Sequence, residues 1–308
     1  MSKRKIQLVG GSSFSISLPK EWIRQNNLKP KDEVSIELTS DKKLIISANP
    51  KEKTKFDEVL IDAEKNLHID QLIFANYYLG VNTIKIFSKN KIKSDVKTSI
   101  MKAVNELTGM EIIYEDEKNV MIKMLLDKTK ININQIIYRI LIIINQSIEN
   151  INENFDINEI KINENAVDKL YHMANSILNC SLFDSEILDN SNIKNVFLIP
   201  QYIFILKKLE SIHDNIMKIS GQLEKNPKDL ELIKNNLTIF KDEINKTIRS
   251  LIKGAKFEFD LKKDEDIKMD LSKFDEKSIF FVLKDMIKHL IDIKETLVIF
   301  NYYRDMKN

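Results

Sequence analysis

The spacing of apolar residues changes near residue 128, and this change constrains the fold more than any other feature of the chain. Beyond that point apolar residues recur every three or four positions, which is the period of an amphipathic α-helix. Short polar loops separate three such stripes and predict antiparallel helices in a bundle. The stripes are Ile133, Ile136, Ile137, Ile140, Ile144, Ile148 and Ile151; Val167, Leu170, Tyr171, Ala174, Ile177 and Leu178; and Ile205, Leu206, Leu209, Ile212, Ile216, Ile219 and Leu223.

The helical pattern continues after Pro227. Residues 230–252 predict a fourth helix and residues 275–302 a last one, with a charged, irregular segment at 254–273 between them. A weak twofold repeat of three-helix units follows, with a complete unit at 128–225 and a degenerate one at 226–308.

The first fifty residues have a different pattern. Residues 3–9 and 13–18 predict two strands around the Gly10-Gly11 turn, and the second alternates apolar and serine side chains so that one face is buried. Pro19 opens a short helix at 20–27, and residues 34–38 and 44–47 predict a hairpin around a turn at 40–42. Some fifty residues rarely make a secure core alone, so a homodimer is expected.

Between these regions, residues 51–127 predict a small α/β sandwich. Strands are expected at 56–61, 83–87, 111–114 and 120–125, and helices at 69–79 and 94–107, ended by Gly80 and Gly109. The predicted fold class is therefore α+β multidomain, with domains at 1–50, 51–127, 128–225 and 226–308.

Composition limits the classes of protein that the chain can belong to. A net charge of +2, with 43% hydrophobic and 31% charged residues, excludes a polybasic tail but not a local basic patch. The single cysteine, Cys180, excludes an intramolecular disulfide and fits a reducing compartment; its helical apolar context predicts a buried structural thiol. No stretch reads as a signal peptide or a membrane span, so a cytoplasmic location without membrane insertion is expected.

No catalytic motif is found. The chain has no P-loop, G-x-G-x-x-G, G-x-S-x-G or H-E-x-x-H sequence. The histidines lie in separate segments, so no nucleophile and base can be paired. We therefore expect a protein that is not an enzyme.

The N-terminal segment resembles the AbrB/SpoVT family. The resemblance depends on Arg4-Lys5, the Gly10-Gly11-Ser12 turn, Ser15-Ile16-Ser17-Leu18-Pro19-Lys20, Trp22 and Leu28-Lys29-Pro30-Lys31-Asp32-Glu33-Val34. It implies a DNA-binding, swapped-hairpin β-barrel to which both chains of a dimer contribute. Lys31 departs from the small residue usual before Asp32. Trp22 is expected to anchor the core or the dimer.

The helical region resembles PhoU proteins, which regulate phosphate uptake. Val167-Asp168-Lys169-Leu170-Tyr171 is similar to the family's "xVDRLY" helix, and Leu209-Glu210-Ser211-Ile212-His213-Asp214-Asn215-Ile216 is similar to "LERIADHAxNI". The combination with an AbrB-like segment resembles an archaeal architecture. The fold that this resemblance implies is a C-terminal all-α region of PhoU-like three-helix bundles.

The PhoU resemblance also implies multinuclear clusters of divalent or iron-type metal ions on the bundle surface. The expected ligands are two pairs of acids spaced four residues apart on a helix, and Glu210 and Asp214 should face outward, away from the apolar stripe. These ligands are Glu164, Asp168, Glu210 and Asp214. His213 is a further possible ligand. The alternative is an ordinary charged helix face. In the second half Lys288 stands where the family has Glu, which puts a second metal site in doubt.

Basic residues of the N-terminal segment are the expected DNA contacts. Each appears twice in a dimer, so about ten positive charges could face the phosphate backbone. The residues are Lys3, Arg4, Lys5, Lys20 and Arg24. The alternative is a solvated lysine-rich surface without a ligand.

The sequence thus predicts a homodimeric, DNA-binding transcriptional regulator of phosphate uptake, with a sensory or metal-binding helical region. The alternative is a signalling adaptor that docks on a phosphate transporter or sensor protein, in which the β-domain only dimerises. An antitoxin is a third hypothesis, since AbrB-like folds occur there, but the long helical region argues against it.

Overall fold

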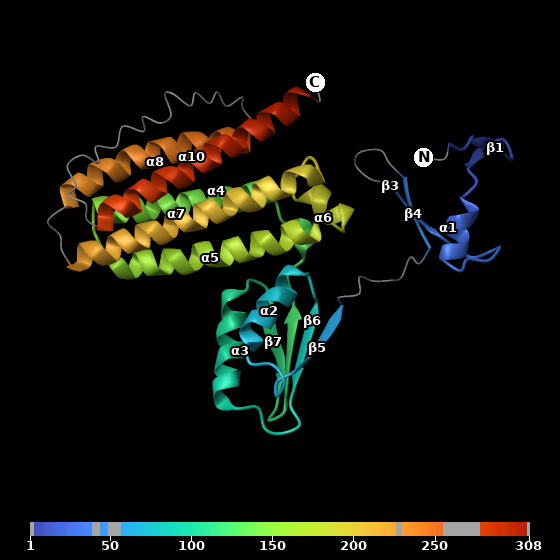
Figure 1. Ribbon diagram of the computed structural model, residues 1–308, viewed down its shortest axis with the longest axis horizontal. Coiled ribbons are helices and arrows are strands. Elements are labelled where there is room, and N and C mark those ends of the chain that lie inside the picture. The colour runs from blue at the N-terminus through green and yellow to red at the C-terminus, as the bar shows by residue number, and fades with distance from the viewer. Residues whose placement is uncertain (1–2, 39–43, 49–56, 226–229, 255–277, 307–308) are drawn as a thin grey trace. The chain divides into compact units, whose positions relative to one another are not determined.

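A computed structural model describes residues 3–38, 44–48, 57–225, 230–254 and 278–306 (Figure 1). Its contacts divide the chain into two compact units, residues 1–55 and 56–308. The features expected at 40–42, 56, 227 and 255–277 lie outside the described residues. The finer division of the chain into four domains stays a prediction.

The N-terminal unit contains the elements that the sequence predicts, with shorter strands. β1 (Gln7–Val9) pairs antiparallel with β2 (Ser13–Ser15). The turn between them needs glycine, because Gly10 and Gly11 have φ angles of 64° and 80°. The helix α1 (Lys20–Gln25) follows Pro19, and β3 (Ser35–Leu38) pairs with β4 (Leu44–Ser47) in a separate two-stranded sheet.

The described residues of this unit form no core in a single copy. None of its described side chains is buried, and Phe14 is 76% exposed. The expectation that the Phe14 and Ile16 face of the second strand is buried is therefore wrong for one chain. The physical reason is that two hairpins and one short helix supply no second layer to cover that face.

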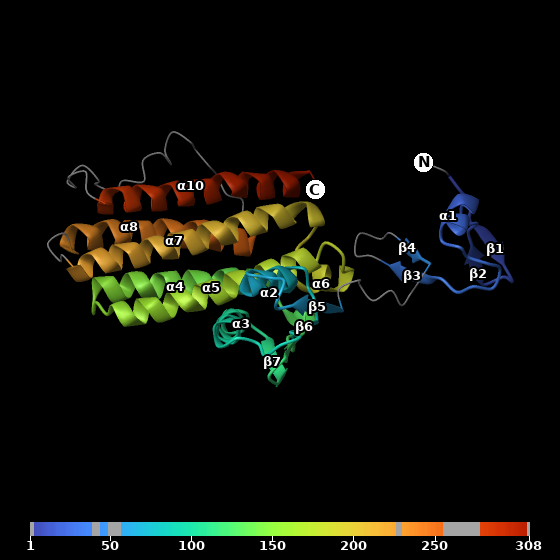
Figure 2. The same cartoon turned by 60° about the horizontal axis from the view of Figure 1, so that its bottom comes forward.

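The α/β part of the larger unit is a four-stranded sheet with two helices that pack side by side (Figure 2). The strand order is β5-β6-β8-β7, with β5 parallel to β6 and the other pairs antiparallel. One apolar core joins the sheet to the helices and includes Ile73, Tyr77, Ile84 and Ile122. The elements are β5 (Glu58–Asp62), α2 (Ile69–Tyr78), β6 (Thr83–Phe87), α3 (Ser94–Glu106), β7 (Met110–Glu115) and β8 (Asn119–Met124).

The rest of this unit is a bundle in which the long helices share a single core. α5 packs on α4 and α7, α8 packs on α4, and α10 packs on α7. The predicted stripes are confirmed, because nearly all of their residues are buried and the others, such as Leu170, pack against the core. The elements are η1 (Lys128–Lys130), α4 (Ile133–Asn152), α5 (Ile157–Cys180), α6 (Ser185–Asn190), η2 (Val196–Leu198), α7 (Ile199–Lys225), α8 (Leu230–Lys253) and α10 (Ser278–Asp305).

Side-chain caps begin these helices where the sequence changes from loop to helix. The Asn132 side chain accepts a hydrogen bond from Asn134 N, and the Asp156 side chain accepts one from Asn158 N. The bundle contacts the α/β part through α2 and α5, where Ser176 Oγ donates to the Tyr77 carbonyl at 2.6 Å. Among the described helices, none combines the length and apolarity needed to cross a bilayer.

Candidate metal centre and nucleic-acid interface

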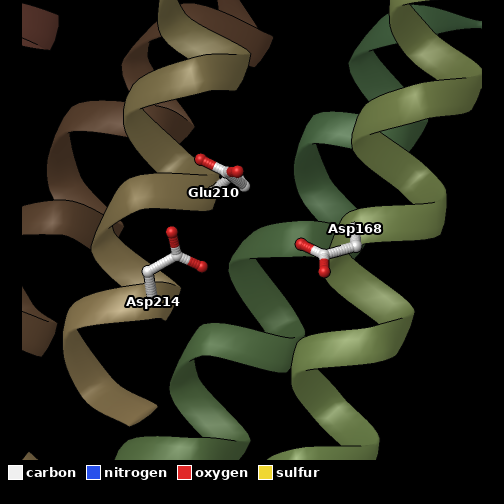
Figure 3. A group of neighbouring side chains, drawn as sticks. All are labelled: Asp168, Glu210 and Asp214. Atoms are coloured by element: carbon white, nitrogen blue, oxygen red, sulfur yellow. The ribbon is translucent and has the colours of Figure 1, made fainter. Parts of the chain in front are cut away.

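Three of the four predicted metal ligands converge in the bundle. Asp168 projects from α5 toward Glu210 and Asp214 of α7 (Figure 3). One carboxylate oxygen from each lies within 4.8 Å of the others. Glu210 and Asp214 are one helical turn apart and therefore share a face of α7. We refer to Asp168, Glu210 and Asp214 as the acidic cluster.

The acidic cluster lies between helices rather than on an outward face, which corrects the expectation for Glu210 and Asp214. The Glu210 side chain is only 13% exposed, because α5 packs along the same side of α7. Glu164 is one turn before Asp168 but is not a member of this group. Partial burial and the nearby charge of Asp214 raise the pKa of Glu164.

Burial and the charges of neighbouring carboxylates raise the pKa values of Asp168 and Asp214. Burial raises the pKa of Asp168 to about 6, and the charges of Asp214, Glu210 and Glu164 add to the effect. Burial also raises the pKa of Asp214, with Glu210 as the next cause. A cation placed among the three oxygens would offset both the cost of burying charged carboxylates and the repulsion between them.

A lysine that the sequence analysis missed already supplies part of this positive charge. Lys207 Nζ lies 2.6 Å from Glu210 Oε2 and 5.4 Å from the centre of the Tyr171 ring. The three-residue spacing of Lys207 and Glu210 on one helix is the signal that could have identified the pair.

The donor atoms of the cluster fit a hard divalent cation. All are carboxylate oxygens, which suit magnesium, manganese or iron better than softer metals. His213 does not join them, because its Nε2 bonds Ser147 Oγ at 2.9 Å in the bundle core. Burial lowers the pKa of His213 to about 4, so this imidazole stays neutral near pH 7.

A lysine of α7 lies against the acids of α10 in the second half of the bundle, where a second metal would be considered. Lys208 Nζ lies 2.7 Å from Asp292 Oδ2, and His289 Nε2 lies 3.2 Å from Asp285 Oδ2. No second group of three convergent ligands occurs within the described residues. The ammonium of Lys208 compensates the nearby acids at this position.

The predicted DNA contacts are all exposed. Lys3, Arg4 and Lys5 precede β1, and Lys20 and Arg24 lie one turn apart on α1. None of the five forms an ion pair within the part of the chain that the structure describes. Nearby, Lys31 has a φ angle of 84°, so the backbone keeps the glycine-like conformation despite the side chain.

The N-terminal unit is a small β-domain with two hairpins, a short helix and exposed cations, and none of its described side chains is buried. Residues 7–55 match one family, described as antidote-toxin recognition MazE, bacterial antitoxin. This match supports an N-terminal domain of the AbrB/SpoVT type and does not extend to residues 56–308. Comparison with curated proteins and with solved structures gave no significant match.

Proposed function

We propose that the protein is a DNA-binding transcriptional regulator of phosphate uptake that acts as a homodimer. The observation that carries this proposal is the surface of the N-terminal unit. Apolar side chains that a second chain could cover are exposed there, together with the cationic side chains of Arg4, Lys5, Lys20 and Arg24. A dimer would bury these apolar side chains and would double the number of cationic side chains in one DNA-binding domain.

Charge doubling gives the domain its affinity for DNA. Each cation that contacts a phosphate releases a condensed counterion. The logarithm of the binding constant therefore falls linearly as the logarithm of the salt concentration rises. Contacts to the phosphate backbone place the domain, and arginine side chains can then read guanine edges in the major groove.

The acidic cluster would act as the sensory element. A bound divalent cation would compete with Lys207 for Glu210 and would hold α5 against α7. A short path leads from there to the α/β part, because the Tyr78 hydroxyl of α2 shares a hydrogen bond with His172 Nδ1 of α5. Cation binding could thus alter the α2–α5 contact and, through it, the geometry of the dimer.

A DNA titration tests the proposal. A promoter fragment from a phosphate-uptake gene is titrated with wild type and with Arg4→Ala/Arg24→Ala at several salt concentrations. The double substitution removes four phosphate contacts from a dimer, so the salt slope should become shallower by about 3.6. Lys89→Ala/Lys102→Ala, which removes two exposed cations of the α/β part, is the matched control. Wild-type binding no stronger than that of the Arg4/Arg24 variant would remove the hypothesis.

The description of the matching family favours antitoxin activity as a second candidate. An antitoxin neutralises a protein partner, so its full-length form should retain that partner in a pull-down and suppress its toxicity on co-expression. Retention of a transporter subunit without DNA would instead favour the adaptor hypothesis. The titration and the pull-down together distinguish the transcriptional regulator, the antitoxin and the adaptor.

A further inference from the structure

Among the residues that the structure describes, no strand pairs with the outer edge of β5 in the α/β sheet. β5 lies at the edge and pairs with β6 in continuous register, from Glu58 opposite Thr83 to Asp62 opposite Phe87. Thr83 N donates to Asp57 O at 3.0 Å, and Ala63 N donates to Phe87 O at 2.8 Å. Residues 57, 59, 61 and 63 therefore direct their backbone groups toward β6. The N–H and C=O groups of Glu58 and Leu60 point away from the sheet.

The opposite edge of the sheet, formed by β7, has features that hinder pairing with another chain. β7 has a register shift between Ile112 and Tyr114, and its Glu115 is held by Lys97 Nζ at 2.6 Å. Bulges and charges are common devices that prevent a sheet edge from pairing with another chain. β5 also carries a paired charge, since Glu58 Oε2 lies 2.7 Å from Lys85 Nζ, but it has no register shift and its central residue, Leu60, is 65% exposed.

The short segment between β4 and β5 favours a second copy of β5 as the pairing partner. Ten residues, 48–57, separate the end of β4 from the start of β5, and they can span at most about 35 Å. In the dimer on which the proposed function depends, two copies of β5 are therefore tethered to one N-terminal domain. Such tethering produces effective concentrations in the millimolar range.

We propose that β5 pairs antiparallel with β5 of a second copy, joining two four-stranded sheets into one continuous sheet across the dimer. The favoured register is centred on Val59 and sets Glu58 opposite Leu60 of the second copy. A register centred on Leu60 would instead place Glu58 opposite Asp62, and like charges directly opposite each other destabilise a sheet.

Site-specific crosslinking of the full chain tests this pairing. In a Cys180→Ala background, Leu60→Cys is treated with a bis-maleimide whose reach is about 8 Å, the spacing of diagonal neighbours across two strands. The matched control is Met101→Cys on α3, which is 52% exposed. The expected result is a covalent dimer for Leu60→Cys and none for Met101→Cys.

Light scattering before crosslinking separates the possible failures. A protein that is dimeric by mass but gives no Leu60→Cys crosslink overturns the β5 pairing and leaves the N-terminal dimer intact. A monomeric mass contradicts the dimer of the proposed function, and the β5 pairing falls with it.

A second variant tests the backbone geometry directly. Leu60→Pro removes an N–H that points outward, so it should spare the β5–β6 ladder and abolish pairing with the second copy. In a Glu58→Cys chain this substitution should lower crosslinking at least about tenfold, with an unchanged thermal transition of residues 56–308. Crosslinking that survives Leu60→Pro contradicts the proposal.

Discussion

Phe14 of the N-terminal unit is 76% exposed, whereas Phe240 of α8 is fully buried in the bundle core. The same contrast extends to the neighbouring residues. Ile6 and Ile36 are exposed, while Ile140 and Ile205 have no exposed surface. The two units therefore obtain their stability differently. The bundle buries its apolar surface within one chain, whereas in the proposed dimer the N-terminal unit would bury its exposed apolar side chains against a second chain.

Phenylalanine truncation should give the largest effects. Phe240→Ala should lower the unfolding free energy of the larger unit by about 3–5 kcal/mol, because it leaves a cavity in a closed core. That loss should not depend on protein concentration. Urea unfolding at several concentrations measures it.

Phe14→Ala is the matched change in the other unit. It should convert the dimer to a monomer in light scattering and weaken DNA binding, while the transition of the larger unit stays unchanged. A Phe14→Ala protein that remains dimeric would show that the exposed face does not bury against a second chain.

Loss of charge compensation inside the bundle should have the next largest effect. Lys294 of α10 is 2% exposed in its side chain, and its Nζ lies 3.0 Å from Glu243 Oε2. Glu243→Gln should cost about 2 kcal/mol, because it weakens a charge-assisted hydrogen bond to a buried ammonium. Glu149→Gln, which breaks the more exposed pair with Lys241, should cost less than about 1 kcal/mol. Equal losses in urea unfolding would contradict this difference.

The acidic cluster predicts a smaller effect with a defined pH dependence. Because the pKa of Asp168 in the folded chain is about 6, above its ordinary value, the folded state holds this proton more tightly than the unfolded state. The unfolding free energy should therefore fall as pH rises from about 4 to 6 and stay lower above that range.

Asp168→Asn removes the carboxylate charge and therefore tests whether that charge lowers the stability of the folded chain. With a chelator present, the variant should be stabilised by about 1 kcal/mol at pH 7.5 and hardly changed at pH 4. Manganese or magnesium should raise the melting temperature of wild type but not of the variant. A variant that is less stable than wild type at pH 7.5 would contradict the cost of holding a charged Asp168 in this partly buried, negatively charged position.

The backbone at Lys31 should give the smallest effect, and it is confined to the N-terminal unit. Lys31→Gly should stabilise the dimer by roughly 0.5 kcal/mol, because glycine adopts a φ of 84° without strain but loses more backbone freedom on folding. Lys31→Ala removes the same charge but keeps the β-carbon, so it should give no gain. Thermal melting of the dimer measures both, and equal results would exclude a backbone cause.

Local pattern predicted the helices and strands well, and it did so for a physical reason. The Ile133 to Ile151 stripe has the period of one helix face, so burial of that face follows from the spacing alone. Glycine at positions 10 and 11 likewise identified the turn that requires positive φ angles. The short helix α6 has no such stripe, and the sequence analysis did not identify it.

The geometry of the acidic cluster was predicted in part. The four-residue spacing places Glu210 and Asp214 on one face of a helix, and this holds in any fold that keeps the helix. Their convergence with Asp168, the absence of Glu164 from the group and the burial of His213 depend on how α5 and α7 are rotated against each other. That rotation is set by side-chain packing between helices, which no single stripe encodes.

The sequence by itself determined where the long helices and the strands lie and which residues carry charge, because these properties depend on neighbours a few positions apart. Only the tertiary structure decided that the long helices share one core, that three carboxylates from two helices meet, and that β5 presents an open edge. These features depend on contacts between residues far apart in the chain, where the geometry of packing rather than the local period selects the outcome.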